Sequence, residues 1–223
     1  MSTLQEAWPF LRDGFELTIT LLVLSMILSA VLGTILAAMR VSPVAPFRLF
    51  GAGYVNIFRN TPLVVLFILV VEGFPPIDIR PSLEQVGLNT FETLAVIALS
   101  VYTAAFVCEV VRSGVNTVDA GQAEAARSVG MSFGQTLRII VLPQAFRSVI
   151  PPMASVYIAL AKNTSVAAAF GVLEATAQLS RMNERSIAPI TVLFLYLAAG
   201  YIIIVWIISA IAAILERRLA VAR

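Results

Sequence analysis

Five apolar runs alternate with polar segments along the chain. The runs cover about 17–39, 58–72, 91–111, 149–172 and 187–215. A helix of about 20 apolar residues crosses the hydrocarbon core of a bilayer, so the pattern predicts an all-α integral membrane protein with five transmembrane helices, forming one domain over residues 1–223. With five spans, the two ends of the chain lie on opposite sides of the membrane.

Composition agrees with this pattern and argues against several kinds of binding site. Hydrophobic residues make up 59% of the chain and charged residues 13%, and the mean hydropathy is +0.92, as expected for a membrane protein. The chain has no histidine and one cysteine, so no metal site is predicted. The only lysine, Lys162, follows alanine rather than the glycine of a P-loop, which excludes ATP binding by that motif. The net charge of +2 gives no argument for a nucleic-acid partner.

The distribution of arginine predicts the orientation in the membrane. With the N-terminus outside, the cytoplasmic segments hold ten arginines and the external segments hold four. The cytoplasmic ones are Arg40, Arg48, Arg59, Arg112, Arg127, Arg138, Arg147, Arg217, Arg218 and Arg223, and the external ones are Arg12, Arg80, Arg181 and Arg185. Because cytoplasmic loops carry the excess of positive charge, we expect the N-terminus outside and the C-terminus in the cytoplasm.

The segment 116–144 is a long cytoplasmic loop between the third and fourth predicted spans. Asp119 is a candidate N-cap with Gln122 in the position of a capping box, and Gly130 fits the residue that closes the helix. Ser132–Gln135 forms a second capping box, which begins another helix. A short alanine-rich helix is marginal in water by itself, so we expect this one to dock against a partner.

Polar residues interrupt the fourth predicted span. Lys162, Asn163, Thr164 and Ser165 lie within it, where an ionisable side chain costs at least ~2.5 kcal/mol. Lys162 could meet a substrate carboxylate, with the residues after it lining a pathway. It could instead pair with Glu109 of the third span or extend to the membrane interface.

Arg59, Asn60 and Thr61 at the start of the second span, and Glu109 in the third, complete the candidate pathway. Each charged residue also has a structural interpretation. Arg59 can reach the headgroup region, and Glu109 can pair with Arg112 one helical turn away. For Glu109 the ion pair is favoured over a ligand role.

Successive segments resemble the permease subunits of binding-protein-dependent ABC importers, in the polar amino acid branch. These segments are FRNTPLVVLF, AAFVCEVVRSGVNTV, QAEAARSVGM, VLPQAFRSVIPP and LAKNTSVAA. The resemblance runs from about residue 18 to 215 and is strongest to one membrane subunit of actinobacterial glutamate importers. The loop 116–144 is similar to the EAA loop of that family, which contains the coupling helix.

The resemblance implies a type I ABC importer in a bacterial inner or plasma membrane. This chain would be half of the permease, paired with a second, different permease subunit and surrounded by lipid. A separate ATPase dimer would bind ATP and Mg²⁺, and an external binding protein would deliver the amino acid. The chain itself would be no enzyme and hold no cofactor. Carried over to this sequence, the coupling role falls on Gln122, Ala123, Glu124, Ala125, Ala126, Arg127 and Gly130.

The substrate expectation follows from the same resemblance. In relatives that import basic amino acids, an acidic residue commonly stands at the position of Asn163. Its absence here implies an acidic or neutral amino acid, with glutamate first and glutamine second. Two alternatives stay open. A secondary transporter or channel without an ATPase would need a titratable relay or inverted repeats, and an intramembrane hydrolase would have to use Ser165 with Lys162.

Overall fold

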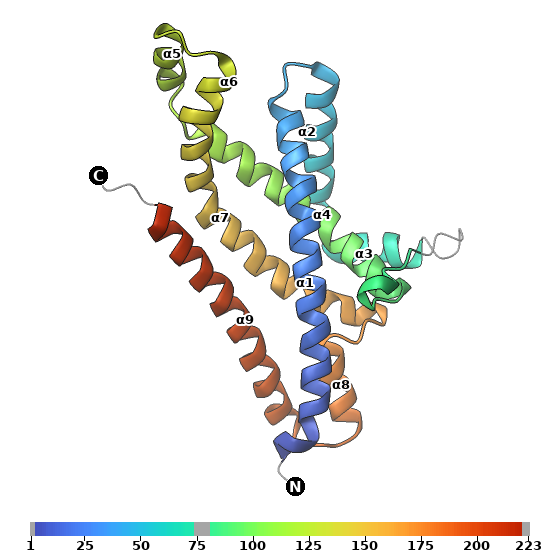
Figure 1. Ribbon diagram of the computed structural model, residues 1–223. Helices are drawn as coiled ribbons and strands as arrows, with labels where there is room; N and C mark the ends of the chain where they lie inside the picture. The colour runs from blue at the N-terminus through green and yellow to red at the C-terminus, as the bar shows by residue number, and fades with distance from the viewer. Residues whose placement is uncertain (1–2, 74–80, 220–223) are drawn as a thin grey trace.

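The computed structural model describes residues 3–73 and 81–219, which form helices joined by short turns, with no strand among them (Figure 1). The long helices are α1 (Thr3–Val41), α2 (Ala45–Asn60), α4 (Thr90–Asn116), α7 (Leu142–Asn163) and α9 (Ile190–Leu219). The shorter ones are α3 (Leu63–Phe67), α5 (Ala120–Ser128), α6 (Phe133–Gln135) and α8 (Ala175–Glu184). The segments η1 (Ile68–Glu72) and η4 (Thr136–Val141) are π-helical, and η3 (Glu84–Val86) and η5 (Thr164–Phe170) are 3-10 helices. The all-α class is confirmed.

Four of the predicted spans correspond to helical runs long and apolar enough to cross a membrane. Within the described residues these runs are Leu4–Val41, Thr90–Asn116, Phe133–Phe170 and Ile190–Leu219. The second predicted span, 58–72, is not a single helix, because α2 ends at Asn60 and the axis turns by 108° before α3 and η1. Pro62 explains the break. It lacks an N–H and keeps Thr61 out of the helical region, at φ −94° and ψ 127°.

Two helices begin earlier than the apolar runs predict. α1 starts at Thr3, so the polar segment before residue 17 belongs to the same helix as the first span. The fourth span, expected from residue 149, is part of a helical run that starts at Phe133. That run passes through Pro143, which lies in the first turn of α7 directly after the π-helical segment η4, where a missing N–H is tolerated.

α4 is the central helix of the fold. It packs most extensively against α1 and also against α7 and α2, and its Leu94, Leu99 and Ala104 side chains are fully buried. Gly33 of α1 lies against Val107 of α4, and a Cβ on that glycine would come within 2.6 Å of the valine side chain. Close helix contacts of this kind need a small residue, so α1 and α4 form a tightly packed pair.

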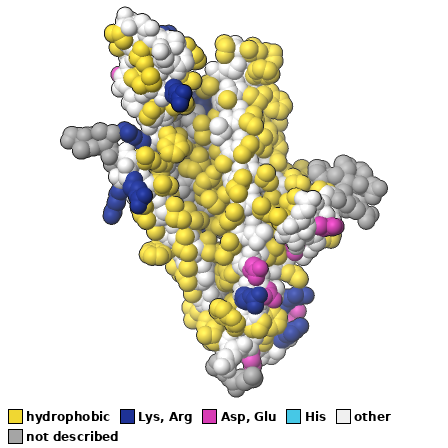
Figure 2. All heavy atoms as spheres, in the orientation of Figure 1, with side chains coloured by type: hydrophobic (Ala, Val, Ile, Leu, Met, Phe, Trp, Pro, Cys, Tyr) yellow, Lys and Arg dark blue, Asp and Glu magenta, His cyan; other side chains and the backbone are white. Residues whose placement is uncertain are grey.

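The two ends of the molecule differ in structure. The N-terminus and α8 lie at one end, and α5 and α6 lie at the other (Figure 1). Figure 2 shows hydrophobic side chains along the length of the molecule between these ends. Large apolar side chains such as Ile27 and Val31 of α1 and Trp206 of α9 are exposed, as expected for helices that face lipid.

A buried carboxylate joins three helices at the α8 end. Glu174 is fully buried at the N-cap of α8, and its Oε1 accepts hydrogen bonds from the backbone N–H groups of Thr176 and Ala177, at 2.8 and 3.0 Å. Its Oε2 accepts hydrogen bonds from the hydroxyl groups of Tyr201 on α9 and Thr18 on α1, at 2.9 and 3.3 Å. Glu174 therefore caps α8 and ties it to both long helices.

Replacing Glu174 with alanine should destabilise the protein by roughly 3–5 kcal/mol, because several buried donors lose their acceptor. The melting temperature of the purified protein in detergent measures the effect. Glu184→Ala, on the exposed end of the same helix, is the matched control and should change that temperature little. Equal melting temperatures for the two variants would show that the buried network does not stabilise the fold.

Candidate functional site

Local hydrogen bonds set the shape of the segment around α5. Asp119 caps the helix as predicted, because its Oδ1 accepts a hydrogen bond from the N–H of Gly121 at 2.8 Å. Gln122 does not complete a capping box with it, since its side chain bonds elsewhere. Gly130 ends the helix with φ +88°, and the N–H of Met131 reaches the carbonyl of Ala126 at 3.1 Å. These features define a Schellman cap, so the predicted glycine closure is confirmed.

The second predicted capping box is also present. The Ser132 hydroxyl accepts a hydrogen bond from the N–H of Gln135 at 3.3 Å, and the Gln135 side chain accepts one from the N–H of Ser132 at 2.8 Å. The box begins the helical run at Phe133. A sharp turn thus separates α5 from that run.

α5 has one buried position and an otherwise accessible surface. Ala126 is buried, Ala123 is half-buried, and Gln122, Glu124, Ala125 and Arg127 are exposed. Two large apolar side chains beside α5 are also accessible, since Val129 is 79% and Phe133 is 77% exposed. Apolar side chains gathered at a protruding tip mark a contact surface for another molecule.

A side-chain hydrogen bond links α5 to the long helical run. The Gln144 Nε2 donates to Oε1 of Gln122 at 2.6 Å and to the carbonyl of Ile140 at 3.0 Å. α5 also packs on η4. Because the run from Phe133 to Phe170 is continuous, it connects α5 physically with the polar residues 162–165 at its far end.

A pocket of about 400 Å³ lies between α4 and α7. Its polar lining comes from Tyr102 and Thr103 on α4 and from Ser155 and Asn163 on α7, and Phe106 supplies an aromatic wall. The pocket combines apolar walls with a few polar groups, which is the usual character of a small-molecule site. Of the four polar residues predicted in the fourth span, Asn163 is the one that lines it.

The neighbours of Asn163 have other surroundings. The Thr164 hydroxyl is buried and donates to the carbonyl of Ala161 at 2.7 Å, and the Ser165 hydroxyl donates to the carbonyl of Lys162 at 2.7 Å. Lys162 itself is exposed and makes no ion pair with the described residues. Pairing between Lys162 and Glu109 was one of the structural alternatives, and the structure does not contain it.

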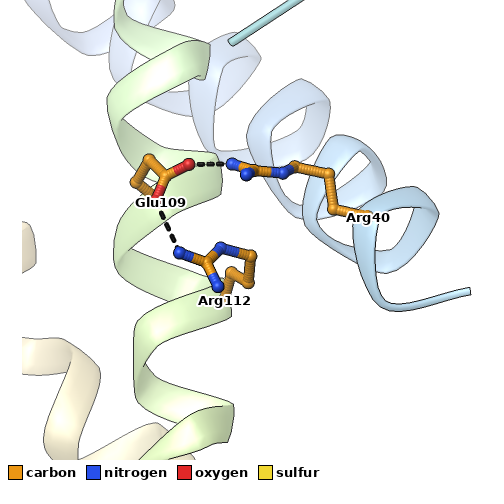
Figure 3. Close-up of polar contacts among 3 residues, drawn as sticks. All are labelled: Arg40, Glu109 and Arg112. Atoms are coloured by element: carbon orange, nitrogen blue, oxygen red, sulfur yellow. Dashed lines mark hydrogen bonds and ion pairs between the residues drawn. The ribbon is translucent and has the colours of Figure 1, made fainter. Parts of the chain in front are cut away.

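Glu109 instead lies between two arginines (Figure 3). It forms ion pairs with Arg112, at 3.0 Å on the same helix, and with Arg40 at the end of α1. The favoured interpretation of Glu109 as an ion-pair residue is therefore confirmed for Arg112. The contact with Arg40 is not predicted from the sequence, because it depends on how α1 packs against α4.

A second, smaller cavity of about 330 Å³ follows on the same side of α4. Arg59, Glu109 and Arg112 line it together with Ser148. The Arg59 guanidinium lies 5.7 Å from the centre of the Phe106 ring, the aromatic wall of the first pocket. The two cavities are therefore neighbours.

The other two residues predicted at the start of the second span have a structural role. The Asn60 amide donates to the carbonyl of Asn56 at 2.7 Å, and the Thr61 hydroxyl donates to the carbonyl of Ile57 at 2.8 Å. Both bonds satisfy backbone carbonyls at the C-terminal end of α2, and neither residue lines the α4–α7 cavities.

In the described part of the chain, no cluster of His, Cys, Asp or Glu side chains could hold a metal ion.

Sequence reasoning missed the residues that form most of the pocket wall. Tyr102, Thr103 and Phe106 lie in an apolar run without a motif of their own, and Ser155 lies in the middle of another. Their spacing is typical of one helical face, but only the packing of α4 on α7 reveals that this face lines a cavity.

Comparison with known proteins agrees with this architecture. Residues 17–221 match the family described as "Binding-protein-dependent transport system inner membrane component". The glutamate transport system permease protein GluC of Corynebacterium efficiens is 42% identical over 210 residues, which cover 92% of each chain. The L-cystine transport system permease protein TcyB of Bacillus subtilis is 35% identical and covers 96% of this chain and 88% of its own length.

A solved structure gives the same result for the fold. It is described as the crystal structure of an amino acid ABC transporter with histidines, and it superposes with a TM-score of 0.84 at 28% identity over 98% of this chain and 99% of the other. The family model covers most of the chain, and the identity to curated relatives extends over nearly the same residues. The chain is therefore a member of the family of inner membrane components of binding-protein-dependent transport systems.

Proposed function

We propose that this chain is the permease subunit of an ATP-driven importer for an acidic or neutral polar amino acid, with glutamate first and glutamine second. The observation that carries the proposal is the continuous helical run Phe133–Phe170, which α5 contacts at one end and which supplies Asn163 to the pocket at the other. It joins a surface fit for a partner protein to a site fit for a small polar molecule. The similarity to a glutamate permease supports the choice of substrate.

In this proposal α5 is the coupling helix and contacts a separate ATPase, which holds the ATP and Mg²⁺. The exposed apolar side chains Val129 and Phe133 support a protein contact here. Small residues such as Ala125 allow a partner backbone to approach closely. Ala126 is buried on the inner side of α5, and the exposed Gln122 bonds to Gln144 of α7. Movement of the ATPase would then be passed directly to α7.

The proposed substrate pathway follows the α4–α7 cavities. Asn163 offers an amide to the amino acid in the first pocket without adding charge. Arg59 and Arg112 line the neighbouring cavity, where their positive charges favour a passing carboxylate. Glu109 neutralises part of that charge through its ion pairs. Lys162, exposed and without an ion-pair partner in the described residues, remains available to a substrate or to the second permease subunit.

The assembly follows from family membership and the proposed orientation. A second, related permease subunit would complete the pathway, and an external binding protein would deliver the amino acid at the α8 end. The α5 end would face the cytoplasm, in keeping with the excess of arginine assigned to that side. The protein is a multi-pass inner membrane protein.

Transport into proteoliposomes tests the proposed function. The complete complex is reconstituted with internal ATP and supplied with the binding protein and labelled glutamate, glutamine or arginine. We expect accumulation of glutamate or glutamine that requires both ATP and the binding protein. Uptake that continues without ATP and follows an ion gradient would support a secondary transporter instead.

Asn163→Asp should lower the rate of glutamate transport about ten-fold, because a carboxylate in the pocket repels an anionic substrate, and about 1.4 kcal/mol changes a binding constant ten-fold. The same assay measures the variant at equal protein amounts. Asn60→Asp introduces the same charge at the end of α2, outside the pocket, and is the matched control. If both variants transport glutamate at the wild-type rate, Asn163 does not face the substrate.

A further inference from the structure

An apolar groove lies on the opposite side of α7 from the proposed pathway. It consists of two adjoining cavities of about 310 and 710 Å³ that share Phe146, Val149 and Met153 of α7. α9 forms the other wall through Ile208, Ala212 and Leu215. Apolar side chains supply nearly the whole surface of both cavities. The groove is therefore suited to hydrocarbon rather than to a polar substrate.

The groove lies in the half of the molecule that contains α5. Its lining includes Leu142 and Pro143 at the start of α7, Val115 at the end of α4 and Leu219 at the end of α9. All three of these helix ends lie toward α5 and away from α8 (Figure 1). In the orientation proposed above, the groove opens into the inner leaflet of the membrane.

Basic side chains lie at the cytoplasmic rim of the groove. Arg147 is part of its lining, and Arg218 lies one helical turn after Leu215 of the lining, on the same face of α9. Both arginines are exposed, and Glu216 is the acidic residue in the same turn of α9. Figure 2 shows basic side chains near the C-terminal end of α9. The rim is therefore net positive.

We propose that this groove binds an anionic phospholipid of the inner leaflet, with its acyl chains along Phe146 and Met153 and its phosphate near Arg147 and Arg218. Acyl chains gain little by exchanging lipid for an apolar protein surface, so the arginines supply the preference for an anionic headgroup. Basic pockets between transmembrane helices on the cytoplasmic side bind such headgroups. The proposal rests on the proposed orientation but not on the identity of the amino acid.

Native mass spectrometry of the complete transporter complex tests the site. The complex is titrated with phosphatidylglycerol or with phosphatidylcholine that has the same acyl chains. We expect tighter binding of phosphatidylglycerol, and a loss of about five-fold in its affinity in Arg147→Gln and in Arg218→Gln. Binding of phosphatidylcholine should not change. Arg138→Gln removes the same charge from the exposed face of η4, outside the groove, and should have no effect.

A second variant tests the apolar part of the groove independently of charge. Ala212→Phe fills the space between α9 and α7 and should reduce the binding of both lipids. Equal affinity of the wild type for the two lipids, or equal losses in Arg138→Gln and Arg147→Gln, would overturn the proposal. Cross-linking of Met153→Cys to the second permease subunit would also overturn it, because protein would then cover the groove. Lipid binding is measured without transport, so failure to transport glutamate would leave this result unaffected.

Discussion

Replacing Gly130 with valine should abolish amino acid transport and the stimulation of the ATPase, while insertion into the membrane stays intact. Gly130 closes α5 with φ +88°, a conformation that costs a non-glycine residue roughly 1–2 kcal/mol and is worse for a β-branched one. Apart from its two chain neighbours, no residue has an atom within 4 Å of the position that a Cβ would take, so the chain itself has room for the side chain. The expected damage is therefore to the shape of the tip and to its fit with the ATPase.

Gly87→Val is the matched control for this prediction. Gly87 also has a positive φ, of +76°, and open space around its Cβ position, but it follows η3 far from α5. The two variants share the backbone strain and differ in location.

Glu124→Lys should uncouple the transporter as well, because it reverses a charge on the exposed side of α5. Normal ATP-driven transport in Gly130→Val or in Glu124→Lys would show that α5 is not the coupling helix.

Glu109→Leu should destabilise the protein by roughly 3–5 kcal/mol, because it leaves Arg40 and Arg112 without a counter-charge in a site that is largely shielded from solvent. The Arg40 side chain is 18% and the Glu109 side chain 22% exposed. The melting temperature in detergent measures the loss. Glu16→Leu breaks the pair between Glu16 and Arg12, whose side chains are 70% and 67% exposed, and should cost less than about 1 kcal/mol.

The same variant separates a structural from a substrate role for Glu109. Transport is measured per molecule of correctly inserted protein, with the conservative variant Glu109→Gln alongside Glu109→Leu. If Glu109 has only a structural role, its replacement lowers the amount and stability of the protein and leaves the transport rate per molecule close to normal. Wild-type stability combined with lost transport would assign Glu109 to the substrate pathway and contradict its role as an ion-pair residue.

Features that depend on neighbouring residues could be predicted from the sequence. The closure of α5 at Gly130 and the box formed by Ser132 and Gln135 need only a few adjacent residues, and both are present. The predicted box between Asp119 and Gln122 was wrong because a more distant partner, Gln144, takes the Gln122 side chain. Local capping rules consider only neighbouring residues and do not include a distant partner such as Gln144.

Features that depend on packing could not be predicted in this way. Arg40 reaches Glu109 only because α1 lies against α4, and Glu174 gathers its partners from α1, α8 and α9. The apolar pattern likewise places the second span near Pro62 but does not define the 108° turn there. Hydropathy reports how much of a segment prefers lipid, whereas the direction of the helix after a proline is set by its contacts.

The exposed tip beside α5 also has a consequence for the assembly of the transporter. In the proposed orientation, with α5 as the docking site of the ATPase, a newly inserted chain would present Val129 and Phe133 to the cytoplasm with little cover. Such a surface is a target for aggregation and for cellular quality control. A cell that makes this permease in excess over the ATPase should therefore degrade the surplus, so the supply of the soluble partner would set how much permease accumulates in the membrane.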